Sequence, residues 1–297
     1  MNIVEPSVEE IINDTPGKKM EYCGRVCYKS DSNINDNSYI KFLQNIAKSG
    51  HTSVLEHERL CFEIDMSYDL NRIIPNLKFF TITSSGLKNY ISADVRAWLE
   101  NCDEENIFYP HLQEIYPFLF TGNLSFKMPF IKLIDKTEIS KMDEKLASEI
   151  KTNHVARTFK IVCSRSCTHQ LVRHRAFSFS QQSQRYCNFS NDKFGHSVDF
   201  IMPEFTDVKK FSNDEQETIK QMLIKCYSEA EENYFNLIDI GLRAEDARSV
   251  LPNAAASIIV MTGTVKAWES FFKLRCDSHA QREIRDIACL IKSEIYK

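Results

Sequence analysis

The stretch "VARTFKIVC" (155–163) is rich in apolar and β-branched residues and is predicted to form a strand of mixed character. It runs directly into "SRSCTHQLVRHR" (164–175), which is predicted to be a helix. A second strand is expected at "RLCFEIDM" (59–66), where four apolar residues face one side and charged residues the other. The chain therefore combines strands and helices.

Helical periodicity and end signals assign most of the other segments. Helices are expected at 35–50, at 212–241, in "AEDARSVLP" before Pro252, at 265–276 and at 278–296. Periodicity leaves "AAASIIVMT" open as a strand or a buried helix. Residues 84–153 are expected to be helical and irregular, with "ISADVRAWLENC" as one helix. These assignments predict an α+β fold over residues 1–297, a single domain with a central, mostly antiparallel sheet flanked by long helices.

Composition excludes several classes of protein. The chain has 297 residues and a net charge of −4, which argues against a general polyanion binder. No apolar run approaches the roughly 20 residues of a membrane span, and the acidic start "MNIVEPSVEE" lacks a signal peptide, so a cytoplasmic location without membrane contact is expected. The ten cysteines are scattered, so reduced thiols are expected instead of disulfides or structural zinc.

Positive charge is concentrated in one region. Residues 151–191 contain seven Lys or Arg and no Asp or Glu. Within it, Gln170, Arg173 and His174 would share a helical face, and the polar run "AFSFSQQSQRY" follows Arg175. This density of guanidinium, amide and hydroxyl groups favours a phosphate-bearing ligand. The alternative is a solvated arginine face paired with acids elsewhere in the chain.

Three other segments carry polar side chains at informative positions. In "RCDSHAQREIR" (275–285), Asp277 or Ser278 is expected to cap the last helix, with Arg275 and His279 beside its start. "GHTSVLEH" (50–57) is predicted to be a polar turn. Its His and Glu residues lack the H-E-x-x-H order of a common metal site, so a metal site is disfavoured here. Arg248 alone would be an ordinary surface arginine. No glycine-rich nucleotide loop is present.

Taken together, these motifs resemble the flavin-dependent thymidylate synthases. The resemblance rests on Arg173-His174-Arg175 with Ser183, followed by matches in "GHTSVLEH", "ARSVLP" and "LRCDSHAQREIR" in the family's chain order. It implies a homotetramer with shared active sites, with a long insertion at about 84–153. It also implies reductive methylation of dUMP to dTMP with bound FAD, with 5,10-methylenetetrahydrofolate as carbon donor and NADPH as reductant, and no nucleic-acid partner.

The resemblance also assigns roles to residues. Arg275 would be catalytic and lie against the uracil. The dUMP ligands would be Gln170, Arg173, Gln181, Gln182, Ser183, Gln184, Arg185, Arg248 and Arg275. The FAD contacts would be Ser53, Arg173, His174, Arg175, Thr264, Lys266, Ser270 and His279, with His51 near flavin and folate. Thr264, Lys266 and Ser270 depart from the Asn-x-Arg and Asn that the family commonly carries.

Two other functions fit parts of the sequence. A nucleic-acid-binding module could use the basic region, with Phe177, Phe179 and Tyr186 stacking on bases. A nucleotide hydrolase could place His51, Glu56 and His57 around a metal. A thymidylate synthase that uses a cysteine nucleophile is disfavoured, because none of the ten cysteines follows a proline as that type requires.

Overall fold

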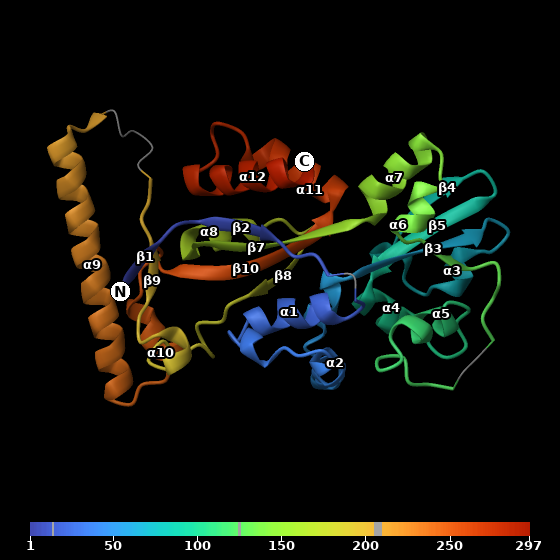
Figure 1. Ribbon diagram of the computed structural model, residues 1–297, viewed down its shortest axis with the longest axis horizontal. Coiled ribbons are helices and arrows are strands. Elements are labelled where there is room, and N and C mark those ends of the chain that lie inside the picture. The colour runs from blue at the N-terminus through green and yellow to red at the C-terminus, as the bar shows by residue number, and fades with distance from the viewer. Residues whose placement is uncertain (14, 124–125, 205–209) are drawn as a thin grey trace.

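The computed structural model describes residues 1–13, 15–123, 126–204 and 210–297. The chain is elongated, with two four-stranded sheets placed one after the other along its long axis and a long helix standing at one end (Figure 1). Both four-stranded sheets are antiparallel throughout, which confirms the α+β class. The prediction of one central sheet is wrong, because the strand predicted at 59–66 is confirmed but pairs with strands between residues 81 and 133 in a second sheet.

The first sheet has the order β2 (Ser7–Glu10), β7 (Ala156–Ser164), β10 (Ala256–Thr264), β8 (Ser178–Gln181). Strands β7 and β10 pair along their whole length, from Ala256 opposite Ser164 to Thr264 opposite Ala156. The segment that periodicity left undecided is therefore a strand. Its central position explains its apolar run, because both of its faces are covered.

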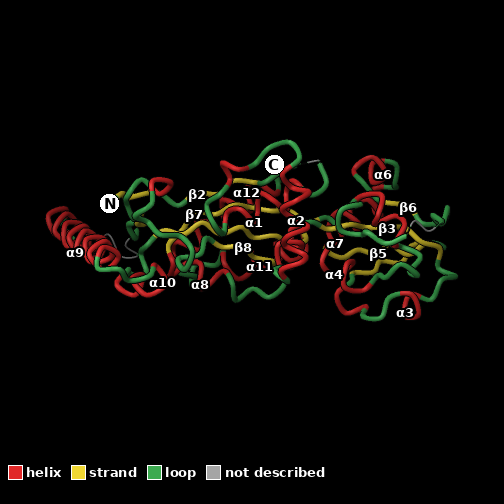
Figure 2. Tube along the Cα trace, turned by 90° about the horizontal axis from the view of Figure 1, so that it is seen from below, coloured by secondary structure: helices red, strands yellow, loops and turns green. Residues whose placement is uncertain are grey.

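Helices cover both faces of this sheet. On one face lie α8 (Arg165–Leu171), α11 (Val265–Arg275) and α12 (Arg282–Ile295), and on the other lie α1 (Lys18–Val26) and α2 (Ser38–Ser49) (Figures 1 and 2). The predicted inward side of α12 is confirmed, since Ile284, Ile287, Ala288 and Ile291 are all buried. Trp268 of α11 is also fully buried, and truncating such a side chain typically costs about 3–5 kcal/mol.

The second sheet has the order β4 (Thr81–Ser85), β5 (Lys88–Asp94), β3 (Arg59–Asp65), β6 (Lys132–Leu133). The predicted single helix in "ISADVRAWLENC" is wrong, because Ile91 to Asp94 belong to β5. Helix α4 (Val95–Asn101) begins only after Asp94, whose side chain accepts a 2.9 Å hydrogen bond from the Ala97 N–H. The other helices here are α3 (Leu70–Ile73), α5 (Tyr109–Ile115), α6 (Lys136–Ser140) and α7 (Glu144–His154).

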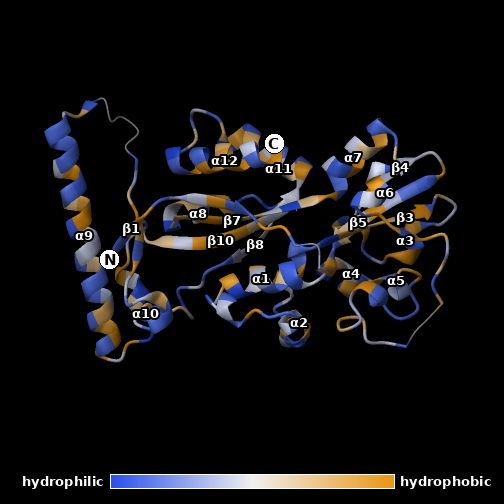
Figure 3. Cartoon of the chain, viewed as in Figure 1, coloured by the Kyte–Doolittle hydropathy of each residue, from blue (hydrophilic) through white to orange (hydrophobic). Residues whose placement is uncertain are grey.

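A third group of elements lies at the opposite end. Strands β1 (Asn2–Val4) and β9 (Asp199–Ile201) pair in parallel, and α9 (Asn213–Asp239) packs beside them. The predicted capping box of Ser212 and Glu215 is present. Tyr227 and Tyr234 are the buried side chains of α9, whereas Cys226, predicted to lie on its apolar stripe, is exposed. Much of α9 is hydrophilic, while the central strands of the first sheet carry the apolar residues (Figure 3).

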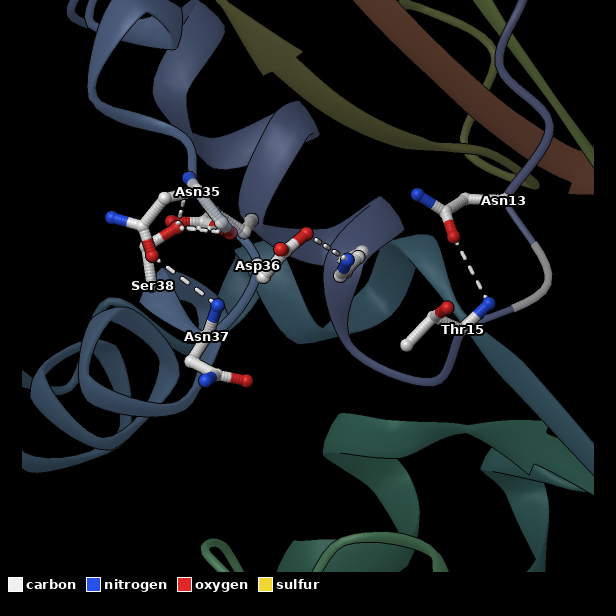
Figure 4. Close-up of polar contacts among 8 residues, drawn as sticks. Asn13, Thr15, Asn35, Asp36, Asn37 and Ser38 are labelled. Carbon is white, nitrogen blue, oxygen red and sulfur yellow. Dashed lines mark hydrogen bonds and ion pairs between the residues drawn. The ribbon is translucent and has the colours of Figure 1, made fainter.

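The remaining elements are short. They are α10 (Ala244–Ala247) and the 3₁₀ turns η1 (Asp31–Asn33), η2 (Thr52–His57), η3 (Leu77–Phe79), η4 (Asp192–Phe194) and η6 (Arg248–Val250). Polar side chains order the loops before α1 and α2 (Figure 4). Asn13 accepts a 2.9 Å hydrogen bond from the Thr15 N–H, and Ser38 accepts one of 2.9 Å from the Asn35 N–H. The Ser38 hydroxyl also donates to Glu21, which links α2 to α1.

All ten cysteines are free thiols, as expected from the sequence. No helix in the described ranges is long and apolar enough to cross a membrane.

Candidate functional site

Helix α8 ends earlier than the sequence predicts. Its last residue is Leu171, so Arg173, His174 and Arg175 lie in the turn that follows, and the predicted shared helical face is wrong. Two backbone hydrogen bonds close this turn, from the Arg173 N–H to Gln170 and from the His174 N–H to Leu171. The chain turns here because β8 begins at Ser178 and Phe177, just before it, is buried with its ring 4.6 Å from that of Trp268.

The turn nevertheless brings the Arg173-His174-Arg175 motif into contact with Arg275 of the "RCDSHAQREIR" motif. The Arg275 Nε donates a 2.9 Å hydrogen bond to His174 Nε2, and a terminal nitrogen of Arg275 lies 3.5 Å from Gln170 Oε1. Gln170 in turn donates to Gln281 at 3.4 Å. Residues 101 to 111 positions apart in the chain therefore form one cluster at the end of α11, which we call the Arg275 cluster (Gln170, His174, Arg275 and Gln281).

Charge and burial fix the protonation of His174. Desolvation lowers the pKa of this imidazole, and the positive charge of Arg275 lowers it further. The imidazole is therefore neutral at physiological pH, with Nε2 as acceptor from Arg275 and Nδ1 as the protonated nitrogen. His174 thus orients the Arg275 guanidinium, and its Nδ1–H is a donor that Arg275 does not use.

Residues 181–185 continue from the end of β8. The Gln181 amide donates to the Ser257 hydroxyl at 3.0 Å, and the buried Gln182 accepts from the Ile258 N–H at 3.4 Å. Both glutamine side chains thus serve the neighbouring strand. Ser183 donates its backbone N–H to Cys27 at 3.0 Å, so the "GRVCYKS" segment (24–30) supports this loop. Ser183, Gln184 and Arg185 are then the predicted ligands of this run with accessible side chains.

A second concentration of positive charge lies near this loop. Arg185 Nε is 3.3 Å from a Glu245 carboxylate oxygen, and Arg248 donates at 3.0 Å to the Glu245 backbone carbonyl. Burial lowers the pKa of Arg165, and the charge of Arg248 lowers it further, which places these two guanidinium groups near each other. Two guanidinium groups close to each other repel, and an anion bound nearby would offset that repulsion.

The basic region is only partly paired. Arg157 and Lys160 bind Glu10 and Glu9, as the solvated-face alternative predicts. Within the described ranges, however, no carboxylate forms an ion pair with Arg165, Arg173, Arg175 or Arg248. Arg185 in the loop is paired with Glu245, whereas the arginines of α8 and of the turn are unpaired, which favours an anionic ligand there over a solvated face.

The η2 turn brings two predicted contacts to the surface. His51 and Ser53 are exposed at its start. His57 is buried at its end, and its ring nitrogens lie 2.7 Å from the Thr262 hydroxyl and 2.8 Å from the Ser180 hydroxyl. Burial lowers the pKa of His57 to about 3, so the ring is neutral and fastens η2 to the sheet.

The metal interpretation of this turn is not supported. Both nitrogens of His57 are occupied, and Glu56 forms an ion pair with Arg96 at 2.7 Å. Among the residues that the structure describes, three metal-binding side chains come together only at Cys163, Cys167 and Glu283. The Glu283 carboxylate there already accepts hydrogen bonds from the backbone and hydroxyl of Ser164.

A cavity of about 350 Å³ lies beside the Arg173–Arg175 turn. One wall is Glu56 and residues 175–178, and the other is Phe79 with Asp94, Arg96, Ala97 and Glu100. Arg175 carries no ion pair in the described part of the chain, so its guanidinium is available to an anionic group. The cavity is a suitable size for part of a large cofactor.

The other predicted flavin contacts lie farther away. Thr264 caps α11 by accepting from the Ala267 N–H at 3.3 Å, and Lys266 and Ser270 are exposed on its first turns. The helix rise places Thr264 roughly 16 Å from Arg275 along the axis. These residues therefore do not join the Arg275 cluster, although an extended cofactor could reach them along α11.

The start of the last helix also differs from the prediction. Helix α12 begins at Arg282, and Gln281 caps it by accepting from the Ile284 N–H at 3.3 Å. Asp277, expected as a cap, instead binds the backbone N–H and ring of the exposed His279. Gln281 therefore connects the start of α12 to Gln170 in the Arg275 cluster.

One known family matches most of the chain. The pattern of the family described as thymidylate synthase complementing protein matches residues 10–75 and 140–297. The chain belongs to this family. Both matched parts contain site elements, since η2 lies in the first and the Arg275 cluster in the second.

Relatives within the family share about half of the chain. The flavin-dependent thymidylate synthase of Pyrococcus abyssi is 40% identical over 147 residues, which cover 48% of this chain and 56% of that protein. The corresponding protein of Geobacter sulfurreducens is 40% identical over 136 residues, 46% of this chain and 54% of that protein. The chain thus spans about half the length of the curated relatives it matches. A crystal structure of the UMP/dUMP methylase PolB from Streptomyces cacaoi aligns with 99% of this chain and 92% of its own, at 17% identity and a TM-score of 0.46.

Residues 76–139 lie outside the family match, and they include β4, β5, β6 and α4. This unmatched stretch overlaps the insertion predicted at 84–153; the division of the chain into domains stays a prediction. Sequence reasoning missed the contribution of this stretch to the cavity beside Arg175. It also missed Glu245, which stands three residues before Arg248 in the same motif region.

Proposed function

We propose that the chain catalyses the reductive methylation of dUMP to dTMP with bound FAD, using 5,10-methylenetetrahydrofolate as carbon donor and NADPH as reductant. The observation that carries this proposal is the 2.9 Å hydrogen bond from Arg275 to His174, because it unites motifs that are far apart in the sequence. Membership of the family and the unpaired arginines around this contact support it.

The residues suggest where the nucleotide lies. The dUMP phosphate would bind Ser183, Gln184 and Arg185, with Arg248 nearby, and each charge-assisted contact is worth about 1.5–3 kcal/mol. The uracil would lie against Arg275, whose guanidinium stabilises negative charge on the N3–O edge. Bound FAD would supply the hydride for uracil C6.

The thiols do not offer the alternative route through a cysteine nucleophile. Cys276 directly follows Arg275, but burial raises the pKa of its thiol to about 11. Burial likewise raises the pKa of Cys27, behind the Ser183 loop. At neutral pH both remain almost entirely protonated, and a neutral thiol is a poor nucleophile.

The proposed enzyme is a homotetramer with active sites shared between subunits. The exposure of Arg173, Ser53 and His51 supports this arrangement, because within one chain their side chains are open to a partner subunit.

The first test is cofactor content. We expect the purified protein to carry stoichiometric FAD, because Arg173, Arg175 and the neighbouring cavity offer an anionic flavin nucleotide unpaired cationic groups. Flavin absorbance and release of FAD on denaturation measure this. A colourless protein that also fails to bind added FAD at about 1 μM would contradict the proposal, and steeply salt-dependent binding of single-stranded nucleic acid would then favour the nucleic-acid alternative.

A second prediction concerns Ser183. The phosphate carries the same charge in the ground and transition states, so a hydroxyl that binds it contributes to affinity and not to the barrier. Ser183→Ala should raise the KM for dUMP about tenfold, the value of one hydrogen bond to a charged group, and leave kcat largely unchanged. Steady-state dTMP formation tests this. Loss of kcat with an unchanged KM would instead require a catalytic role for the serine.

A further inference from the structure

The cavity beside Arg175 has walls of two different origins. Arg175 and Glu56 belong to residues matched by the family pattern. Asp94, Arg96 and Glu100, in contrast, come from the end of β5 and from α4, within the unmatched stretch 76–139. The unmatched stretch therefore contributes directly to the surroundings of a residue that the proposed function assigns to FAD.

Arg96 is the central charge of this second wall. Its terminal nitrogen lies 2.7 Å from Glu56, and its Nε lies 2.7 Å from Glu100. These two carboxylates raise the pKa of Arg96, chiefly by hydrogen bonding, so the guanidinium stays charged. The Arg96 side chain is 39% exposed, so these ion pairs border the cavity and are not sealed in the core.

The charges that line the cavity nearly balance. Three carboxylic acids (Glu56, Asp94 and Glu100) face two arginines (Arg96 and Arg175). Burial raises the pKa of Asp94, and its hydrogen bond from the Ala97 N–H opposes that rise. With all five groups charged, the lining has a net charge of −1. Removing Arg96 would leave −2, with two carboxylates no longer neutralised next to Arg175.

The backbone holds Arg96 firmly at this place. The N–H of Val95, its neighbour, donates a 2.9 Å hydrogen bond to the carbonyl of Glu58, directly after η2. His57 fixes the end of η2 to Ser180 and Thr262 in the first sheet. Helix α4, η2 and the strand that follows Arg175 are thus linked by short contacts, so a change at Arg96 acts locally on the cavity.

We propose that Arg96 is a positioning residue for the FAD site. It neutralises Glu56 and Glu100 and holds Glu56 away from Arg175, so that the Arg175 guanidinium remains available to an anionic part of the cofactor. This inference rests on the proposed function, because FAD is the ligand. It assigns a role to a segment that the family pattern does not cover.

The test uses the FAD-loaded protein and does not depend on activity. After dilution, released FAD is followed by its fluorescence in the wild type and in Arg96→Ala, Arg96→Lys and Arg96→Ala/Glu56→Ala. We expect Arg96→Ala to release FAD about tenfold faster, with a larger difference at low than at high salt. Arg96→Lys should lie between these rates. The double variant should approach the wild-type rate, because the lining returns to a net charge of −1.

A matched control separates this role from a general loss of stability. Arg72 is an exposed arginine of α3, just before the unmatched stretch, and is paired at the surface with Asp69, so Arg72→Ala should not change FAD release. The inference is overturned if Arg96→Ala releases FAD at the wild-type rate. It is also overturned if the double variant stays as fast as Arg96→Ala, which would indicate a purely structural role. A wild type that holds no FAD overturns the proposed function itself.

Discussion

Arg173→Ala is expected to abolish dTMP formation. Arg173 lies in the turn after α8, next to His174 of the Arg275 cluster, and its side chain is exposed. The proposed function assigns this one guanidinium to both dUMP and FAD, so its removal takes a charge-assisted contact from each ligand. Because the two losses multiply, turnover should fall by at least 10³-fold, roughly the effect of two contacts worth 2 kcal/mol each.

Folding should not limit this experiment. The Arg173 side chain is exposed and forms no ion pair with any described residue, so its removal should cost little stability. Thermal unfolding of Arg173→Ala and of the surface control Arg72→Ala should match that of the wild type. Near-normal dTMP formation by Arg173→Ala, with FAD and dUMP bound as in the wild type, would show that this part of the basic region is only a solvated face.

Local sequence patterns predicted the elements whose packing is one-sided or strongly capped. The inward residues of α12 and the Ser212–Glu215 cap of α9 follow directly from spacing, because one face of each helix meets solvent. The β4–β5 hairpin was missed. Its strands carry Thr, Ser and Asn at buried positions, such as Ser92, whose hydroxyl contacts the ring of His154 in the core. The alternation of apolar and polar residues that identifies a strand is therefore weak in this segment. The Ser85-Gly86 pair, with Gly86 at a φ of 59°, was the signal for its turn.

The candidate site was also predictable only as far as local patterns and motif order determine it. Motif order predicted that residues near 51, 173, 183, 248 and 275 belong to one function, and family membership confirms the resemblance. No local pattern predicted that α8 ends at Leu171, because burial of Phe177 against Trp268 decides that end. The contact between Arg275 and His174 likewise depends on how α8 and α11 pack on one sheet. Thr264, Lys266 and Ser270 match the family motif poorly and also lie away from the cluster.

Arg275→Lys is expected to lower kcat by about 10²-fold or more, the typical effect of removing one preorganised donor at a developing charge. The Arg275 guanidinium uses Nε on His174 and a terminal nitrogen on Gln170, which leaves its other N–H groups for the uracil that the proposed function places there. Lysine keeps the charge but cannot donate in this planar arrangement, so it loses the orientation that His174 imposes. Because negative charge grows on the uracil only as the reaction proceeds, the loss should appear in kcat, with a KM for dUMP within about threefold of the wild type. Steady-state kinetics at saturating folate and NADPH, with FAD content checked in each variant, measures both constants. Ser183→Ala provides the matched contrast, since it should change KM alone. If Arg275→Lys shifts only KM while Ser183→Ala eliminates kcat, the two roles are reversed, and the negative charge must develop near the serine instead of beside the Arg275 cluster.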